Sequence, residues 1–127
     1  MTEVQPFILI VDDDLAVRDS LSFSLMLDGL EVKACQDGAD LVAHPDLPRA
    51  DCLVLDHHMP EMDGFELLAK VRAQGCRHPV ILLTGHMTDA LQRRAAMAGF
   101  HQVVEKPIQG SGLLECIHDI LRLAEPT

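Results

Sequence analysis

Short apolar runs alternate with amphipathic stretches along the chain. The run over residues 7–11 is continuously apolar, which is typical of a strand covered on both faces of a sheet. Similar runs lie at 52–55 and 79–83, and Gln102-Val103-Val104 indicates a further short strand. Residues 30–35 alternate apolar and polar positions, which favours a strand nearer a sheet edge. The pattern therefore predicts five strands.

The segment after each predicted strand has features typical of a helix. Val17, Leu21 and Leu25 recur every fourth residue and predict a helix that ends near Gly29. Apolar residues at i, i+1, i+4, i+7 and i+8 from Leu113 form a stripe on one face of the last helix. Four helices are predicted after the first: one capped by Asp37 that ends before Pro45, one over 65–73, one from Thr88 to residue 98, and one opened by Ser111.

Strand and helix thus alternate five times. Parallel strands joined by right-handed helical crossovers are the expected consequence, with helices on both faces of one sheet. We predict a single doubly wound α/β domain over residues 1–127, with its core over about 7–123. The length of 127 residues suits one compact domain.

Composition narrows the classes of function. Twenty acidic residues against ten basic ones give a net charge of −10, which argues against nucleic-acid or anionic-membrane binding through general electrostatics. No apolar run approaches the ~20 residues of a membrane span, and no signal peptide is recognised, so we expect a cytoplasmic protein. The four cysteines lack a C-x-x-C pair and are expected to be reduced thiols rather than zinc ligands: Cys35, Cys52, Cys76 and Cys116.

Polar side chains follow four of the five predicted strands. They are Asp12, Asp13 and Asp14 after the first strand, Asp56 after the third, Thr84 after the fourth, and Glu105 and Lys106, which Pro107 follows, after the fifth. Ligands of such sheets collect beyond the carboxyl ends of the strands, so these groups should lie together. Clustered carboxylates need a cation, and Mg²⁺ prefers oxygen ligands. With a lysine and a hydroxyl beside them, the set favours formation of an aspartyl phosphate.

The motifs at these positions occur in a familiar order. They are Val11-Asp12-Asp13-Asp14, Asp56-His57-His58-Met59-Pro60 with Asp63-Gly64, Thr84-Gly85, and Lys106-Pro107. Together they resemble the receiver domain of two-component (phosphorelay) response regulators, over residues 7–123. The resemblance implies a flavodoxin-like fold with five helices and a five-stranded parallel sheet in the order 2-1-3-4-5. The motifs around Thr84 and Lys106 are most similar to receivers that control transcription, and hybrid sensor kinases carry similar modules.

The resemblance implies a phosphoacceptor and a metal site. Asp56 would take a phosphoryl group from the phosphohistidine of a histidine kinase or of a histidine phosphotransfer protein. Asp13, Asp56 and the backbone carbonyl of His58 would ligate Mg²⁺, for which Mn²⁺ can substitute, and Asp12 would act through water. Such a domain is a signalling module with intrinsic self-phosphorylation and autodephosphorylation activity, and is not a turnover enzyme.

The resemblance also implies how phosphorylation changes the domain. Lys106 would bridge to Asp56 and then to the phosphoryl oxygens, and the Thr84 hydroxyl would swing onto the phosphoryl group. The surface of the fourth helix, fifth strand and fifth helix would then switch, to control a partner, an output domain or a homodimer formed on phosphorylation. The Lys106–Pro107 peptide would be cis. Val103 stands where the family usually has an aromatic switch residue, so we expect a smaller or differently placed change there.

Three histidines lie within two residues of Asp56 or Thr84. The resemblance places His58 and His86 beside the route of water to the phosphoryl group, and we predict that they tune phosphoryl loss between about pH 6 and 8. The third, His57, replaces a residue that is usually apolar. A histidine metal site is the minor alternative. The other histidines are expected at the surface: His44, His78, His101 and His118.

Other classes of function fit the residues less well. Asp12 and Asp14 match the D-x-D-x-[TV] motif of haloacid-dehalogenase phosphatases, but Ala16 stands where Thr or Val belongs. We expect Asp14 to cap the first helix and Glu105 to be solvated. The complete set of acceptor, lysine and acids argues against a module that acts by contact alone. A dinucleotide-binding domain is excluded, because no G-x-G-x-x-G follows the first strand.

Overall fold

The computed structural model describes residues 5–107 and 112–124, in which five strands alternate with five α-helices. The strands are β1 (Phe7–Val11), β2 (Glu31–Cys35), β3 (Cys52–Asp56), β4 (Val80–Thr84) and β5 (Gln102–Glu105). The helices are α1 (Leu15–Leu27), α2 (Gly38–Val42), α3 (Gly64–Ala73), α4 (Asp89–Ala98) and α5 (Gly112–Ala124), with a 3-10 turn at Leu47–Arg49. All ten predicted elements are present. Ser111, expected to open the last helix, lies outside the described residues.

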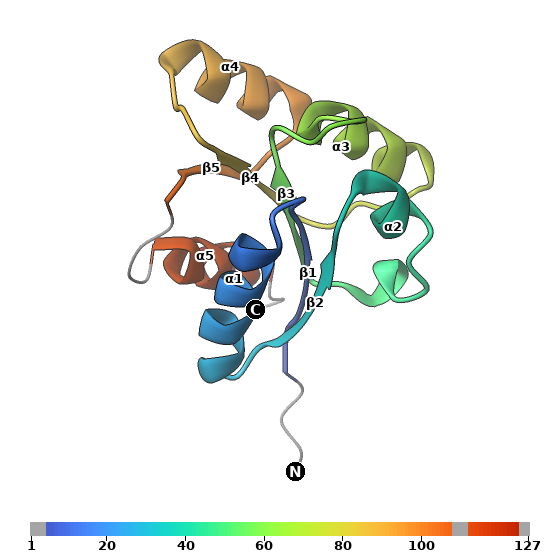
Figure 1. Ribbon diagram of the computed structural model, residues 1–127, viewed down its shortest axis with the longest axis vertical. Coiled ribbons are helices and arrows are strands. Elements are labelled where there is room, and N and C mark those ends of the chain that lie inside the picture. The colour runs from blue at the N-terminus through green and yellow to red at the C-terminus, as the bar shows by residue number, and fades with distance from the viewer. Residues whose placement is uncertain (1–4, 108–111, 125–127) are drawn as a thin grey trace.

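The five strands form one parallel sheet in the order β2-β1-β3-β4-β5 (Figure 1). This order confirms the expected doubly wound topology. Because β1 lies between β2 and β3, the strand order reverses there, and ligands of such sheets bind beside this switch point. In the register, Val11 pairs with Leu55 and Thr84 pairs with Glu105. The carboxyl ends of these four strands therefore share one edge of the sheet.

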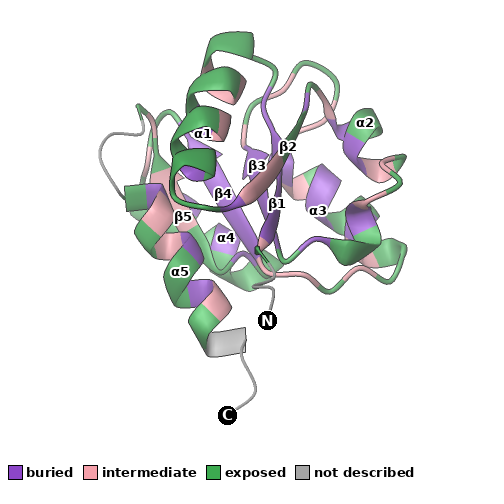
Figure 2. Ribbon diagram, turned by 90° about the horizontal axis from the view of Figure 1, so that it is seen from below, coloured by how far each residue is buried: buried purple, intermediate pink, exposed green. Residues whose placement is uncertain are grey.

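Helices cover both faces of the sheet. One hydrophobic cluster joins one face to α2, α3 and α4, and a second joins the other face to α1 and α5. Figure 2 shows buried residues on the strands and on the inner sides of the helices, and exposed residues on their outer sides. All five residues of each of β1, β3 and β4 are buried, whereas those of β2 and β5, apart from Cys35, are half-buried or exposed. The continuous apolar runs thus lie at the centre of the sheet, as their pattern predicts.

Side chains cap the helices where the sequence predicts caps. The Asp14 carboxylate accepts the amide N–H groups of Ala16 and Val17 at the start of α1, which confirms Asp14 as a cap. Asp37 caps α2 and Thr88 caps α4 in the same way. These caps set the point at which the chain turns from each strand end into the next helix.

All four cysteines are free, and burial raises the pKa of the Cys35 thiol to about 11 and that of Cys52 to about 12.

His44 and His78 were expected at the surface but are half-buried. The His44 ring accepts the Asp46 N–H at 3.0 Å, and the His78 ring lies 2.8 Å from the Leu47 carbonyl. Both rings lie partly inside because they serve as hydrogen-bond partners for backbone groups around the 3-10 turn, which would otherwise lack them.

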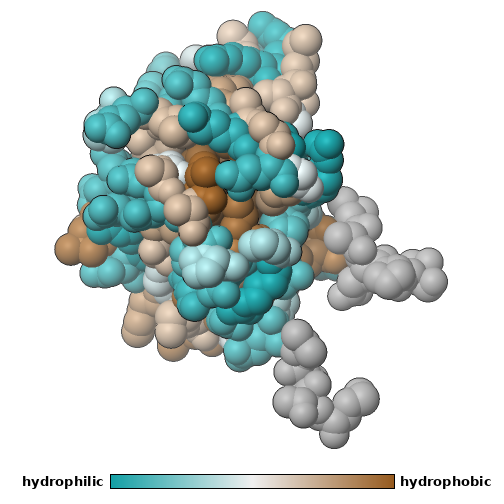
Figure 3. All heavy atoms as spheres, turned by 90° about the vertical axis from the view of Figure 1, so that its right-hand side faces the viewer, coloured by the Kyte–Doolittle hydropathy of each residue, from teal (hydrophilic) through white to brown (hydrophobic). Residues whose placement is uncertain are grey.

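The surface is mainly polar on the side seen in Figure 3. The face that carries α2 and α3 is mainly hydrophilic around a small hydrophobic area (Figure 3). Within the described residues, no helix is long and apolar enough to cross a membrane.

Candidate functional site: three carboxylates and a lysine at the sheet edge

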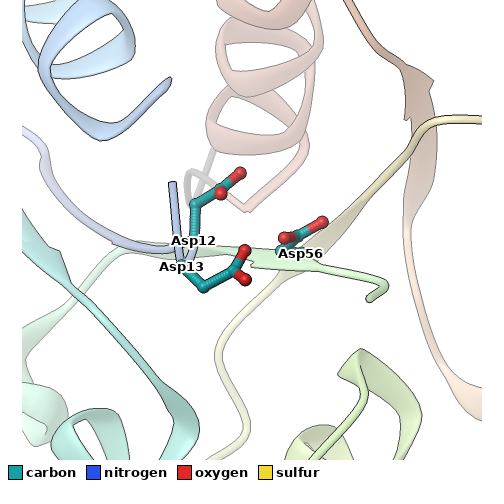
Figure 4. A group of neighbouring side chains, drawn as sticks. All are labelled: Asp12, Asp13 and Asp56. Carbon is teal, nitrogen blue, oxygen red and sulfur yellow. The ribbon is translucent and has the colours of Figure 1, made fainter. Parts of the chain in front are cut away.

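Three carboxylates meet at the carboxyl edge of the sheet. Asp12 and Asp13 directly follow β1, and Asp56 is the last residue of β3 (Figure 4). One oxygen of each carboxylate lies within 4.8 Å of the others. Asp12 and Asp56 are buried, whereas Asp13 is exposed. Negative charges so close together repel strongly where water is largely excluded, so the arrangement calls for positive charge.

Lys106 supplies one positive charge to this cluster. Its ammonium nitrogen lies 2.8 Å from Oδ2 of Asp12 and 3.0 Å from Oδ1 of Asp56. Burial alone would lower the pKa of Lys106, but its hydrogen bonds to the two carboxylates raise it. The lysine therefore stays charged and ties the end of β5 to the ends of β1 and β3.

The Asp56 carboxyl group holds its proton more tightly than an ordinary aspartate. Burial raises the pKa of Asp56 to about 6, the hydrogen bond from Lys106 opposes this, and the charge of Asp12 adds to it. One lysine thus does not neutralise the cluster fully. A proton or a further cation can supply the remaining charge, and the two would compete for Asp56.

The chain after β1 is held by further hydrogen bonds. The second oxygen of Asp12 accepts the Asp14 N–H at 2.9 Å, and the Arg18 guanidinium donates to the Asp12 carbonyl at 2.8 Å. Arg18 was not singled out from the sequence. Its position on the first turns of α1, four residues after Asp14, is the only signal that could have indicated this contact.

The Thr84 hydroxyl lies among histidines. It is buried, and its oxygen lies 3.3 Å from the Nδ1 atom of His57. It also accepts the backbone N–H of His86 and donates to the carbonyl of the same residue, both at 3.3 Å. The His58 ring is exposed and stacks on His57 with 4.1 Å between centroids. His57, which the sequence marked only as an unusual residue, thus brings its side chain into polar contact with the threonine.

The other expected site residues lie around β5. Val103 is half-buried against the cluster that includes α3 and α4. The Lys106–Pro107 peptide bond is cis, as the resemblance implied. Glu105 was expected to be solvated; it is exposed, but its carboxylate also accepts the Met87 N–H at 2.9 Å. This contact joins the end of β5 to the loop after β4.

The chemistry of the donors fits a hard divalent cation. The described residues contain one group of three or more histidine, cysteine or acidic side chains placed to share a metal: Asp12, Asp13 and Asp56. All its ligand atoms are carboxylate oxygens, the donors that Mg²⁺ and Mn²⁺ prefer. A histidine metal site is therefore not supported in this part of the chain.

The amino-acid sequence is similar to those of known proteins. A family model described as the response regulator receiver domain matches residues 8–118. Over 120 residues the chain is 39% identical to the transcriptional regulatory protein FixJ of Bradyrhizobium diazoefficiens, covering 94% of this chain and 58% of the relative. It is 38% identical over 121 residues to the response regulator MprA of Mycobacterium leprae, covering 94% and 52%. The chain thus spans about half the length of these relatives.

Solved structures show the same architecture. The crystal structure of FixJ-N superposes with a TM-score of 0.83 at 31% identity, covering 98% of this chain and all of that one. The Vibrio cholerae chemotaxis protein CheY4 gives a TM-score of 0.86 at 28% identity, covering 92% and 99%.

Proposed function

Because the chain belongs to the family of response regulator receiver domains, we propose that it accepts a phosphoryl group on Asp56 from a histidine kinase or a histidine phosphotransfer protein. The observation that carries the proposal is the position of Lys106, whose ammonium group bridges Asp12 and Asp56. A nucleophilic carboxylate beside a fixed positive charge is suited to attack an anionic phosphoryl group.

Each residue has a defined part in the transfer. An oxygen of the Asp56 carboxylate attacks the phosphorus, the P–O bond forms, and the P–N bond to the donor imidazole breaks. The donor nitrogen keeps the electron pair of that bond and takes up a proton. The Lys106 ammonium group stabilises the negative charge of the phosphoryl oxygens. The Thr84 hydroxyl then donates a hydrogen bond to one of them.

A divalent cation completes the proposed site. Mg²⁺, or Mn²⁺ in its place, would be held by Asp13, Asp56 and the backbone carbonyl of His58, with Asp12 acting through water. When bound, it would neutralise charge on the carboxylates and on the incoming phosphoryl group. The cluster of three carboxylates and the raised pKa of Asp56 support this part of the proposal.

Phosphorylation would act on the rest of the protein through the surface of α4, β5 and α5. Movement of the Thr84 hydroxyl would change the packing of the loop after β4, which Glu105 joins to β5. We infer control of transcription by an output domain in the cytoplasm, because both curated relatives are regulators and one is named a transcriptional regulatory protein. A homodimer formed on phosphorylation is a further consequence of this proposal.

Incubation with acetyl phosphate and Mg²⁺, followed by intact mass spectrometry, tests the proposed function. We expect the mass of one added phosphoryl group, and no addition in Asp56→Asn or in the presence of EDTA. Equal addition to the Asp56→Asn variant would contradict the assignment. Continuous turnover of a small phosphate monoester in excess would instead favour a phosphatase.

A further inference from the structure

The Thr84 hydroxyl is already engaged in the structure. Among the described residues, its hydrogen-bond partners are the His57 ring and the backbone of His86. The single proton of the hydroxyl is donated to the His86 carbonyl, and its two lone pairs can accept the His86 N–H and, in the tautomer with a proton on Nδ1, the His57 ring. A hydrogen bond from Thr84 to a phosphoryl group on Asp56 therefore requires that the hydroxyl leave some of its present partners.

His57 also begins a row of rings that leads away from Thr84. The edge of its ring meets Phe65 on α3 at 5.5 Å between centroids, with the planes at 79°. Phe65 meets Phe100 in the same manner at 5.4 Å and 78°. The Arg94 guanidinium of α4 lies over the Phe65 ring at 3.8 Å. These edge-to-face and cation–π contacts are favourable geometries that depend on ring position.

The far end of this row lies next to β5. Phe100 is buried, lies two residues after the end of α4, and its N–H donates to the Ala95 carbonyl of that helix. Its neighbour His101 donates to the Val80 carbonyl, just before β5 begins at residue 102. The row therefore connects the threonine to α3, to α4 and to the start of β5. Val103, on β5 itself, has no ring that could make such a connection.

We propose that His57 is a positioning residue that holds the Thr84 hydroxyl in its resting place and couples release of that hydroxyl to the packing of Phe65 and Phe100. This inference rests on the proposed phosphorylation of Asp56. When the hydroxyl turns to the phosphoryl group, the His57 ring loses a hydrogen-bond partner and shifts against Phe65. The shift reaches α4 through Arg94 and the start of β5 through Phe100.

Three substitutions of His57 distinguish the effect of its hydrogen bond to Thr84 from that of its ring contact with Phe65. His57→Phe keeps a ring against Phe65 but removes the hydrogen-bonding nitrogen. His57→Asn keeps a polar atom near the place of Nδ1 but removes the ring. His57→Leu removes both. Measurements at pH 8 keep the imidazole neutral, and thermal unfolding of each variant shows that it is folded.

The first readout is the affinity for beryllofluoride with Mg²⁺, which mimics the phosphoryl group. A net hydrogen bond at this position corresponds to roughly a threefold to tenfold change in an equilibrium constant. We expect His57→Phe and His57→Leu to bind beryllofluoride more tightly by this factor, and His57→Asn to stay near the parent. In a Thr84→Val background the tightening should disappear, because the hydroxyl that His57 holds is absent.

The second readout is the chemical-shift change of the Phe100 ring on beryllofluoride addition. We expect the parent to show it and all three variants to lose most of it, because His57→Phe has no hydrogen bond that the hydroxyl can release and the other two variants have no ring against Phe65. Equal affinities of parent and His57→Phe, or the same tightening in the Thr84→Val background, would overturn the positioning role. An unchanged Phe100 response in His57→Leu would overturn the coupling. A parent that neither phosphorylates nor binds beryllofluoride would overturn the proposed function, and this inference with it.

Discussion

The backbone of Gly64 packs directly on the carbonyl group of Asp56. A Cβ atom at Gly64 would stand 2.8 Å from that carbonyl oxygen and equally close to the Leu82 side chain. The Gly64 N–H also donates to the carbonyl of the next residue, His57, at 3.1 Å. The absence of a side chain therefore lets the start of α3 lie against the strand end that carries the proposed phosphoacceptor.

Gly64→Ala should accordingly affect both stability and the site. The new methyl group must displace backbone at the end of β3, so we expect a loss of about 1 to 3 kcal/mol in the free energy of unfolding and slower phosphorylation. Urea denaturation and the initial rate with acetyl phosphate measure the two effects. Gly112→Ala is the control, because nothing lies within 4 Å of a Cβ there. Equal stabilities of the two variants would show that the contact is not tight.

The fold and the acidic cluster could be predicted because both depend on the order of residues along the chain. Continuous apolar runs mark the central strands, and the residue after each run must lie at the carboxyl edge of a parallel sheet. Asp12, Asp13, Asp56 and Lys106 meet for that reason, and the structure brings them together.

Contacts that individual side chains make at or beyond the strand ends could not be predicted in this way. The contact of His57 with Thr84 depends on the rotamers of two residues at the ends of neighbouring strands. The sequence showed only that a polar residue stands in an unusual place. The contact of Glu105 with Met87 likewise depends on the path of the loop after β4. The tuning of phosphoryl lifetime by His58 and His86 stays a prediction.

Removal of the Asp13 carboxylate should weaken Mg²⁺ binding. Asp13→Asn keeps the shape of the side chain but removes a charge from the exposed side of the cluster, so we expect roughly a tenfold or greater loss of Mg²⁺ affinity with the fold intact. Phosphorylation rates across a Mg²⁺ titration measure the loss. Asp14→Asn is the matched control, because asparagine also caps helices. An Asp13→Asn protein with the parent's Mg²⁺ dependence would contradict the assignment.

Stability should depend on the charge of Asp56. A pKa raised to about 6 means that the folded state binds this proton more tightly than the unfolded state. The resulting stabilisation is fully present below the ordinary aspartate pKa near 4, and it is lost as the pH rises through about 6. In the absence of metal, the ionised group thus destabilises the fold at pH 7.

We therefore expect Asp56→Asn to raise the free energy of unfolding at pH 7 by about 1 to 3 kcal/mol, with the difference from the parent shrinking towards pH 4. Urea denaturation in EDTA at the two pH values measures it. Asp119→Asn serves as the control, because the Asp119 side chain is 66% exposed and should change stability by only about 0.5 kcal/mol. A gain that does not change with pH would show that ionisation of Asp56 is not its cause.

Replacement of Lys106 should lower phosphorylation without lowering Mg²⁺ affinity. Lys106→Met removes the positive charge that lies 2.8 Å from Asp12 and 3.0 Å from Asp56. The pKa of Asp56 should rise further above its ordinary value, since the hydrogen bond that lowers it is gone. At a pH high enough to ionise Asp56 in the variant, the more negative cluster should bind Mg²⁺ at least as tightly as the parent does. Phosphorylation by acetyl phosphate should nevertheless fall by about a hundredfold, because no ammonium group stabilises the phosphoryl oxygens.

The matched control for this lysine is Lys33→Met. Lys33 pairs with Asp46 at 2.7 Å, but its side chain is 48% exposed, and a surface ion pair of this kind contributes about 0 to 1 kcal/mol. Its removal should leave both Mg²⁺ affinity and phosphorylation unchanged. Calorimetric titration with Mg²⁺ and the initial rate of phosphorylation, measured on the same preparations, separate the two effects. If the Lys106→Met protein loses Mg²⁺ affinity together with phosphorylation, the main role of the lysine is to hold the carboxylates in place. If it keeps its Mg²⁺ affinity and loses phosphorylation, the charge of the lysine acts on the phosphoryl group.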